Sequence, residues 1–221
     1  MDNCQMWNFG LSLKKNKRIR QLHWFSWFLF FDNWNCIWQN NTNVQIVVYS
    51  SSITFQENWE NVLGRTDVAN RGIPGYTTGQ WIWTIKNGLH DHWDSKIWFF
   101  EWKINDISFG CFCQTNFWDY KTTVDSLKRN HIIAVVQSTI LKNSTKTDNK
   151  KVSKLNKLVR KYCLKNEVDY INLNAFLSRD VELIKKRTTN GWYLQQQAFQ
   201  PWCEAIKSLV EIRNIMLKFD R

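Results

Sequence analysis

The fold class is decided by one stretch, VQIVVYSSSIT, which runs from Val44 to Thr54. Its first six residues form a run rich in β-branched side chains, typical of a central parallel strand that is buried on both faces. Three serines, Ser50–Ser52, follow at once, and a helical pattern begins near Phe55. A strand, a tight polar turn and a helix place hydroxyl groups at the carboxyl edge of a sheet, where open α/β folds hold their functional sites. We therefore expect the chemistry of this chain at the three serines.

Strand and helix patterns alternate from this stretch to the end of the chain. We expect strands over 44–49, 67–70, 96–101, 131–137 and 168–173, and helices over 55–63, 77–91, 114–130, 149–166 and 201–219. Five strands that alternate with five helices predict an α/β fold, a three-layer α/β/α sandwich around a five-stranded parallel sheet. The sequence shows no internal repeat.

Composition and charge limit the function classes. A chain of 221 residues with 43% hydrophobic content can bury one substantial core. Its 30 lysines and arginines exceed its 19 acidic residues, and a net charge of +11 would permit binding to anionic surfaces. Part of the excess lies in the expected helix at 150–165, where Val152, Leu155, Leu158, Val159 and Tyr162 form one apolar stripe, so its lysines form an ordinary solvated face. No nucleic-acid motif accompanies them, and we expect no nucleic-acid partner.

Residues 1–43 differ from the rest of the chain. The basic segment Lys14–Arg20 precedes an apolar run, Leu22–Phe31. A charged region before about ten apolar residues fits a secretory signal or a short anchor, whereas a spanning helix needs about twenty residues. A tail on the domain surface fits equally well. We therefore divide the chain into a basic and aromatic extension, 1–43, and a domain, 44–221. The protein is expected to be exported or membrane-associated if residues 14–31 act as a signal or anchor, and cytoplasmic otherwise.

The six cysteines show no metal-binding pattern. They have no C-x-x-C spacing and no histidine nearby that would suggest zinc, so we expect no metal site. Isolated structural thiols are the simplest interpretation. A disulfide between Cys203 and either Cys111 or Cys113 is the alternative, if all three lie at the same edge of the sheet.

Four blocks of residues stand at expected strand ends or before the last helix: Ser50–Thr54, Asn70–Thr78, Lys103–Asp106 and Asn190–Tyr193. In this order they resemble the blocks of the SGNH, or GDSL-type, hydrolase family, over about four fifths of the chain. The resemblance implies a flavodoxin-like SGNH hydrolase fold, ester hydrolysis and no cofactor. The family patterns Gly-Asp-Ser-x-Thr, Asn-x-Gly and Gly-x-Asn-Asp place Ser52 at the nucleophile position and assign the oxyanion hole to Gly72 and Asn105.

The departures from the family concern proton transfer. The family's last block, Asp-x-x-His, falls on Asn190 and Tyr193, so both the acid and the imidazole are missing. A tyrosine, with a reference pKa of about 10, is protonated at neutral pH and cannot act unaided as the base that a serine nucleophile needs. An asparagine carries no charge to stabilise an imidazolium. Ser50, Ser51 and Lys103 replace the family's glycine, aspartate and second glycine.

No histidine is expected to substitute for the missing base. His90 and His92 end a helix of about fourteen residues, which places them roughly 20 Å from the carboxyl edge at 1.5 Å per residue. His131 opens the fourth expected strand and belongs to the opposite edge. His23 lies in the extension. We expect the histidines of the domain to be structural.

Two functions therefore compete. The first is a serine ester hydrolase of the SGNH type with impaired catalysis, acting on acyl or acetyl esters of lipids or carbohydrates. The second is a pseudo-hydrolase that binds a ligand or a partner without catalysis. Lys103 would attract anionic ligands to the site, or else points to water. The sequence has fourteen tryptophans and only eight glycines, which is unusual for a globular chain. A third explanation for the missing catalytic residues is therefore a decaying gene copy, or a codon assignment that turned glycines into tryptophans. The codons at Trp102, Tyr193 and Ser50 would test it.

Overall fold

The computed structural model describes residues 43–88, 92, 94–102, 104–108, 116–143 and 146–215. The extension over 1–43, apart from its last residue, lies outside this range, so the predictions made for residues 14–31 stay predictions. In the described part, no helix has both the length and the apolar character needed to cross a bilayer.

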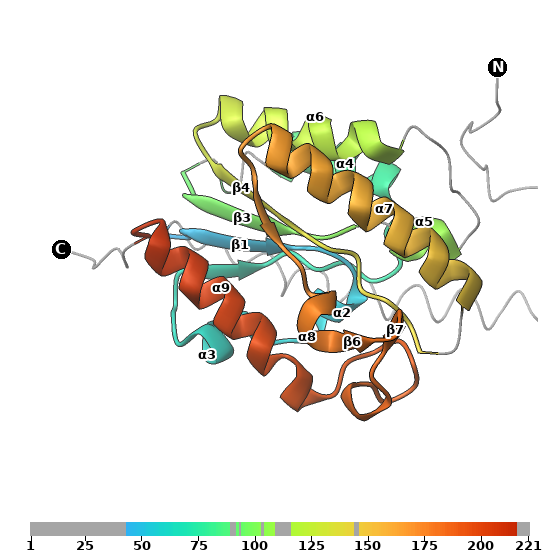
Figure 1. Cartoon of the computed structure of the whole chain (residues 1–221). Helices are drawn as coiled ribbons and strands as arrows, with labels where there is room; N and C mark the ends of the chain where they lie inside the picture. The colour runs from blue at the N-terminus through green and yellow to red at the C-terminus, as the bar shows by residue number, and fades with distance from the viewer. Residues whose placement is uncertain are drawn as a thin grey trace, which may run out of the picture. The chain divides into compact units, whose positions relative to one another are not determined.

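A five-stranded parallel sheet forms the centre of the domain (Figure 1). Its strands are β1 (Ile46–Tyr49), β2 (Val68–Asn70), β3 (Ile97–Phe100), β4 (Ile133–Gln137) and β5 (Asp169–Ile171), in the spatial order β2-β1-β3-β4-β5. The register pairs Tyr49 with Phe100 and Phe100 with Val136, so the carboxyl ends of the central strands meet at one edge. The predicted fold class is confirmed.

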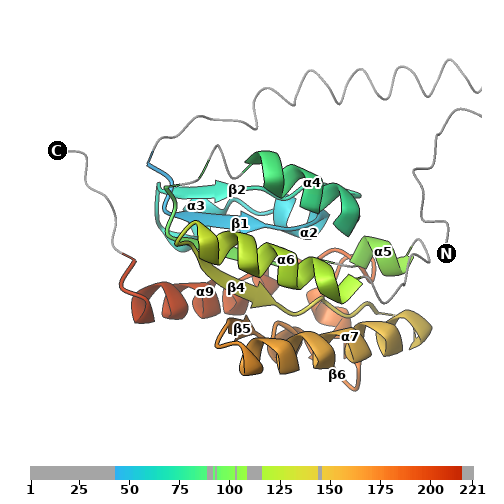
Figure 2. The same ribbon diagram turned by 90° about the horizontal axis from the view of Figure 1, so that it is seen from above.

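Helices cover both faces of the sheet (Figures 1 and 2). One layer contains α4 (Thr78–Gly88), α6 (Asn116–Arg129) and α7 (Lys146–Lys165), and the other contains α3 (Trp59–Leu63) and α9 (Gln200–Ile212). Shorter elements follow the carboxyl ends of strands, namely α2 (Ser52–Phe55), α5 (Ile104–Ser108), α8 (Asn174–Leu177), the hairpin of β6 (Ser178–Arg179) and β7 (Glu182–Leu183), and two one-turn 3-10 helices at Lys185–Arg187 and Gln196–Ala198.

The prediction of one helix over 55–63 is wrong, because this region forms two helices. Asn58 caps the start of α3, where its side chain accepts a hydrogen bond from the Asn61 N–H at 3.1 Å. Gly64 ends α3 in the left-handed conformation, at φ 67°. The preceding helix, α2, begins at Ser52, earlier than expected. The last helix also ends sooner than predicted, at Ile212.

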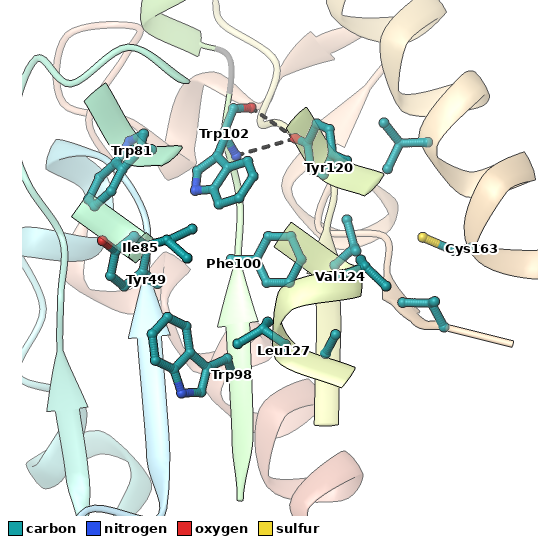
Figure 3. Packing of buried hydrophobic residues seen from close by; sticks show 14 of the residues in the cluster. Tyr49, Trp81, Ile85, Trp98, Phe100, Trp102, Tyr120, Val124, Leu127 and Cys163 are labelled. Atoms are coloured by element: carbon teal, nitrogen blue, oxygen red, sulfur yellow. Dashed lines mark hydrogen bonds between the residues drawn. The ribbon is translucent and has the colours of Figure 1, made fainter. Parts of the chain in front are cut away.

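The core is unusually aromatic on both faces of the sheet. Five tryptophans are at most 1% exposed: Trp59, Trp81, Trp98, Trp102 and Trp202. Figure 3 shows Trp81 from α4 and Tyr120 from α6 packed over Tyr49, Trp98 and Phe100 of the sheet. Alternate strand residues face the opposite layer, which explains why the strands are apolar throughout.

The apolar stripe predicted for α7 is correct only in part. Val152, Leu155 and Val159 are buried against the sheet, whereas Leu158 is 49% exposed. The lysine-rich face of α7 accordingly starts closer to the core than the sequence pattern suggested.

Candidate active site at the carboxyl edge of the sheet

Ser52 is the most accessible of the three serines. β1 ends at Tyr49, and the two serines that follow are buried, Ser50 at 0% and Ser51 at 2% exposure. Ser52 begins α2 and is half-buried, so its hydroxyl lies at the edge where the sheet prediction placed it. Within the described part of the chain, Ser52 Oγ has no hydrogen-bond partner. The side chain is therefore open to contact with a ligand, and no described residue is placed to activate its hydroxyl.

Ser50 joins β1 to Glu101, a buried carboxyl group at the end of β3. Ser50 Oγ lies 2.7 Å from the Glu101 carbonyl oxygen and 2.8 Å from Oε2. A hydroxyl has one hydrogen, so a protonated carboxyl that donates to Ser50 Oγ, while Ser50 donates to the carbonyl, satisfies both contacts. Burial raises the pKa of Glu101 to about 8, which keeps this group neutral at neutral pH. Sequence reasoning missed this residue, although the pairing of Tyr49 with Phe100 sets Glu101 beside Ser50.

Gly72 lies directly against the backbone of α2. A Cβ atom at this position would stand 2.3 Å from the Phe55 nitrogen, so no other residue fits without displacement. Asn70 fastens the same loop, because its side chain donates to the carbonyl oxygens of Thr54 at 3.1 Å and Glu57 at 2.9 Å. The Gly72 N–H itself donates to Asn70 Oδ1 at 2.9 Å. Its predicted role in an oxyanion hole requires that this bond be shared or broken.

Asn105 stands in α5 and is tied to the start of α4. Its side-chain amide donates to the Tyr76 carbonyl oxygen at 2.8 Å, and the carboxylate of Asp106 accepts from the N–H and hydroxyl of Thr78 at 3.0 and 2.9 Å. A primary amide has two hydrogens, so Asn105 retains a second donor for a ligand oxygen. Lys103 lies outside the described residues, and the hypothesis about its charge stays a prediction.

Tyr120 holds the strand end that leads into α5. Its hydroxyl donates to the Trp102 carbonyl oxygen at 3.2 Å and accepts from the Trp102 N–H at 3.3 Å, as the dashed lines in Figure 3 show. Burial, the largest cause, raises the pKa of Tyr120 well above its usual value, so this hydroxyl stays protonated and keeps its donor.

Asn190 and Tyr193 belong to a turn, here called the 190–193 loop. Asn190 Oδ1 accepts from the backbone N–H groups of Trp192 at 3.1 Å and of Tyr193 at 3.0 Å. The Asn143 N–H donates to the Gly191 carbonyl oxygen at 2.9 Å, which anchors the loop to the segment after β4. Tyr193 packs against the core cluster that contains Ile53, the residue after Ser52. The structure thus brings residue 193 to the face of the sheet on which α2 lies.

The two histidines within the described residues do not serve Ser52. His92 is 2% exposed and accepts a hydrogen bond at Nε2 from Arg71 Nε at 2.8 Å. Burial and the Arg71 guanidinium lower the pKa of His92 to about 4, so the imidazole is neutral and structural. His131 precedes β4 and lies at the amino edge of the sheet, opposite to Ser52.

The cysteines and carboxylates do not form a further site in the described part of the chain. Cys163 and Cys203 are free, buried thiols, so the alternative of a disulfide at Cys203 is wrong. Burial raises the pKa of both thiols to about 12, which makes them unreactive. In the same part, no three histidine, cysteine, aspartate or glutamate side chains gather in a way that could hold a metal ion.

Solved structures of esterases and lipases share this arrangement of sheet and helices. A GDSL-like lipase from Bacteroides thetaiotaomicron VPI-5482 matches with a TM-score of 0.70 and 16% sequence identity, over 84% of this chain and 98% of the lipase. The domain has the SGNH hydrolase fold. An aryl esterase from M. smegmatis matches with a TM-score of 0.62 and 12% identity, over 78% of this chain and all of the esterase.

A third solved structure, the acetyl xylan esterase AlAXEase, matches with a TM-score of 0.63 and 15% identity over 76% of this chain and 100% of the esterase. No family model and no curated protein matches the sequence itself. Structural similarity at such low identity establishes the fold, so the chemistry has to be argued from the residues at the sheet edge.

Proposed function

We propose that the domain binds small acyl or acetyl esters of lipids or carbohydrates at Ser52 and hydrolyses them very slowly. The SGNH fold and the half-buried Ser52 hydroxyl at the carboxyl edge of the sheet support ester chemistry. One observation supports slow turnover: Ser52 Oγ has no hydrogen-bond partner within the described residues, so nothing there is placed to accept its proton.

The proposed reaction uses three groups at the site: the Ser52 hydroxyl, the Asn105 amide and the Gly72 N–H. Ser52 Oγ would attack the ester carbonyl carbon, and the carbonyl oxygen would gain negative charge. The second amide hydrogen of Asn105 would donate to this oxygen, joined by the Gly72 N–H when Asn70 releases it. The proton of Ser52 would have to leave to water, because Asn190 and Tyr193 supply no base. The C–O bond to the alcohol would then break, and the alcohol would leave with a proton from water. A second water molecule would hydrolyse the acyl ester on Ser52, release the carboxylic acid and restore the hydroxyl.

The expected deficit is large. In serine hydrolases with a complete triad, removal of the serine or histidine lowers turnover by about 10⁶, while binding and the oxyanion hole retain about 10³ to 10⁴ over the reaction in water. The non-enzymatic alternative, a pseudo-hydrolase that only binds its ligand, is favoured by residues 190 and 193, because an asparagine and a tyrosine supply neither the carboxylate nor the imidazole of a triad.

The decisive experiment restores the missing pair. The full chain and its Asn190→Asp, Tyr193→His variant are assayed with a short-chain aryl ester. Asn190→Asp preserves the turn, because a carboxylate oxygen accepts the same two hydrogen bonds. We expect the variant to be at least a thousandfold faster, and Ser52→Ala in that variant to abolish the gain. Equal rates in the two proteins would refute the proposal.

A covalent probe separates the two candidate functions. An organophosphorus reagent modifies a serine only where the hydroxyl is activated. Slow but stoichiometric modification of Ser52 in the unaltered chain would support an impaired hydrolase. Complete resistance, together with modification of the Asn190→Asp, Tyr193→His variant, would favour the pseudo-hydrolase.

A further inference from the structure

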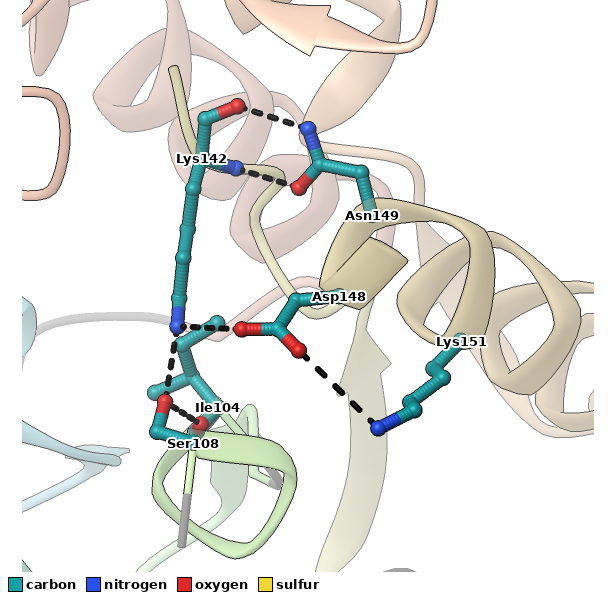
Figure 4. A network of polar contacts seen from close by, with 6 residues as sticks. All are labelled: Ile104, Ser108, Lys142, Asp148, Asn149 and Lys151. Carbon is teal, nitrogen blue, oxygen red and sulfur yellow. Dashed lines mark hydrogen bonds and ion pairs between the residues drawn. The ribbon is translucent and has the colours of Figure 1, made fainter. Parts of the chain in front are cut away.

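A buried lysine, Lys142, lies beside the site and takes no part in the proposed reaction. It follows β4 by five residues, and its side chain is 2% exposed. Asn149 of α7 holds its backbone from both sides, since the Lys142 N–H donates to Asn149 Oδ1 at 2.8 Å and the Lys142 carbonyl oxygen accepts from Asn149 Nδ2 at 2.7 Å (Figure 4). The start of the lysine stem is therefore fixed.

Among the described residues, the ammonium group of Lys142 has three partners, and they come from three different parts of the chain. Its Nζ lies 2.7 Å from Ser108 Oγ in α5, 3.5 Å from Asp148 Oδ2 in α7, and 3.5 Å from the ring centroid of Trp192 in the 190–193 loop. Ser108 Oγ donates its own hydrogen to the Ile104 carbonyl oxygen, so it accepts from the lysine. Three N–H groups thus meet two oxygen acceptors and the face of an indole, which attracts cations.

These partners identify Lys142 as a cation rather than a base. The pKa of Lys142 is lowered from its ordinary value because burial outweighs the opposing effect of the Asp148 carboxylate, so the charged form is argued from its contacts. The carboxylate and the indole face both stabilise only the charged form, and a neutral amine would leave the Trp192 contact without its electrostatic attraction.

Lys142 connects the two parts of the candidate site that lie far apart in sequence. Ser108 stands one turn after Asn105 on α5, and Trp192 directly precedes Tyr193. We propose that Lys142 is a positioning residue, whose ammonium clamps the 190–193 loop to α5 and so sets the distance between residue 193 and Asn105. In its catalytic consequence this inference rests on the proposed function, whereas the clamp itself does not.

Hydrogen exchange of the full chain tests the clamp without any activity. Lys142→Met keeps the length and apolar stem of the side chain but removes the charge. Lys151→Met is the matched control: Lys151 lies on α7 with its Nζ 4.0 Å from Asp148 Oδ1, but its side chain is 39% exposed and it has no bond to Ser108 or Trp192 among the described contacts. We expect amides 188–194 to exchange at least tenfold faster in Lys142→Met and unchanged in Lys151→Met. Unchanged exchange in both variants would overturn the proposal.

A second variant keeps the test valid if Lys142→Met does not fold. Trp192→Leu removes the indole face and leaves the bonds of Lys142 to Ser108 and Asp148. We expect faster exchange at 188–194 and unchanged protection of α5. Exchange at 188–194 equal to that of the unaltered chain would again contradict the clamp.

Activity tests the positioning role in the Asn190→Asp, Tyr193→His variant. Displacement of a catalytic group by about 1 Å can cost about a hundredfold in rate. We expect Lys142→Met to lower kcat by about tenfold to a hundredfold, with KM for a short aryl ester within about twofold, and Lys142→Arg to recover most of the loss. A rise in KM with unchanged kcat would exclude positioning. If the variant with the restored pair is itself inactive, the proposed function fails, and hydrogen exchange still decides the clamp.

Discussion

Replacement of Glu101 by glutamine should stabilise the domain, and the gain should grow as pH rises. Glutamine has nearly the shape of a protonated carboxyl group and keeps a donor for Ser50 Oγ, which lies 2.8 Å from Glu101 Oε2. It differs in one respect that matters here, because it carries no charge at any pH.

The size of the effect follows from linkage. Burial raises the pKa of Glu101 from 4.5 to about 8 in the folded protein. Below the pKa of the unfolded chain both states hold the proton, and the contribution of the group to stability is complete. Between that pH and about 8 only the folded state holds it, so the free energy of unfolding falls by about 1.4 kcal/mol per pH unit, and above about 8 the loss stops. From pH 5 to pH 7 the loss is about 3 kcal/mol.

Urea denaturation of the full chain at pH 5, 6, 7 and 8 measures this difference. The effects of groups that titrate in both proteins cancel in this difference. One such group is His92, whose lowered pKa of about 4 makes the folded state lose stability as pH falls from about 6.5 to about 4. The stability of Glu101→Gln relative to the unaltered chain should increase by about 3 kcal/mol from pH 5 to pH 7. Glu211→Gln, which removes a carboxylate from an exposed position of α9, is the control variant. Parallel curves for Glu101→Gln and the unaltered chain would refute a neutral buried carboxyl group.

Two further comparisons test the packing of the site. Thermal unfolding should show that Gly72→Ala lowers the free energy of unfolding by about 3 kcal/mol, because its Cβ would stand 2.3 Å from the Phe55 nitrogen. Gly79→Ala in α4, where nothing lies within 4 Å of the added atom, should raise it by up to about 1 kcal/mol. Similar effects at the two positions would contradict the close approach. Urea denaturation should show that Trp102→Phe lowers the free energy of unfolding by at least about 1 kcal/mol less than Trp98→Phe does. The Trp98 indole donates a hydrogen bond at 2.6 Å, whereas the buried Trp102 indole has no partner within the described residues. Equal losses would show that the Trp102 N–H is satisfied.

The sheet could be predicted because its strands carry their own signal. Runs such as Ile46–Tyr49 and Ile133–Gln137 are apolar without interruption, as strands buried on both faces must be. The short elements could not be predicted in this way. α5 has five residues, too few for a periodic pattern, and it is held by Asn105 and Asp106 through bonds to the start of α4.

The candidate site, too, could be predicted only in part from the sequence. Ser52, Gly72 and Asn105 were assigned from the order of short blocks at strand ends, and the structure places all three in loops or helices at the carboxyl edge. Glu101 and Lys142 were missed, because their properties come from burial and from neighbours distant in sequence. Glu101 bonds a residue 51 positions away, and Lys142 bonds one 34 positions away.

Asn190 shows how a turn can keep its geometry when its chemistry changes. Its amide oxygen accepts hydrogen bonds from two backbone N–H groups, as a carboxylate oxygen would, so the backbone conformation is the same for a charged and an uncharged side chain. The shape of the 190–193 loop thus depends on the hydrogen bonds of one side-chain oxygen, whereas support for a catalytic imidazole would depend on the charge of that side chain. For the slow hydrolase proposed above, we therefore expect the turn to keep its shape in the Asn190→Asp, Tyr193→His variant while turnover rises.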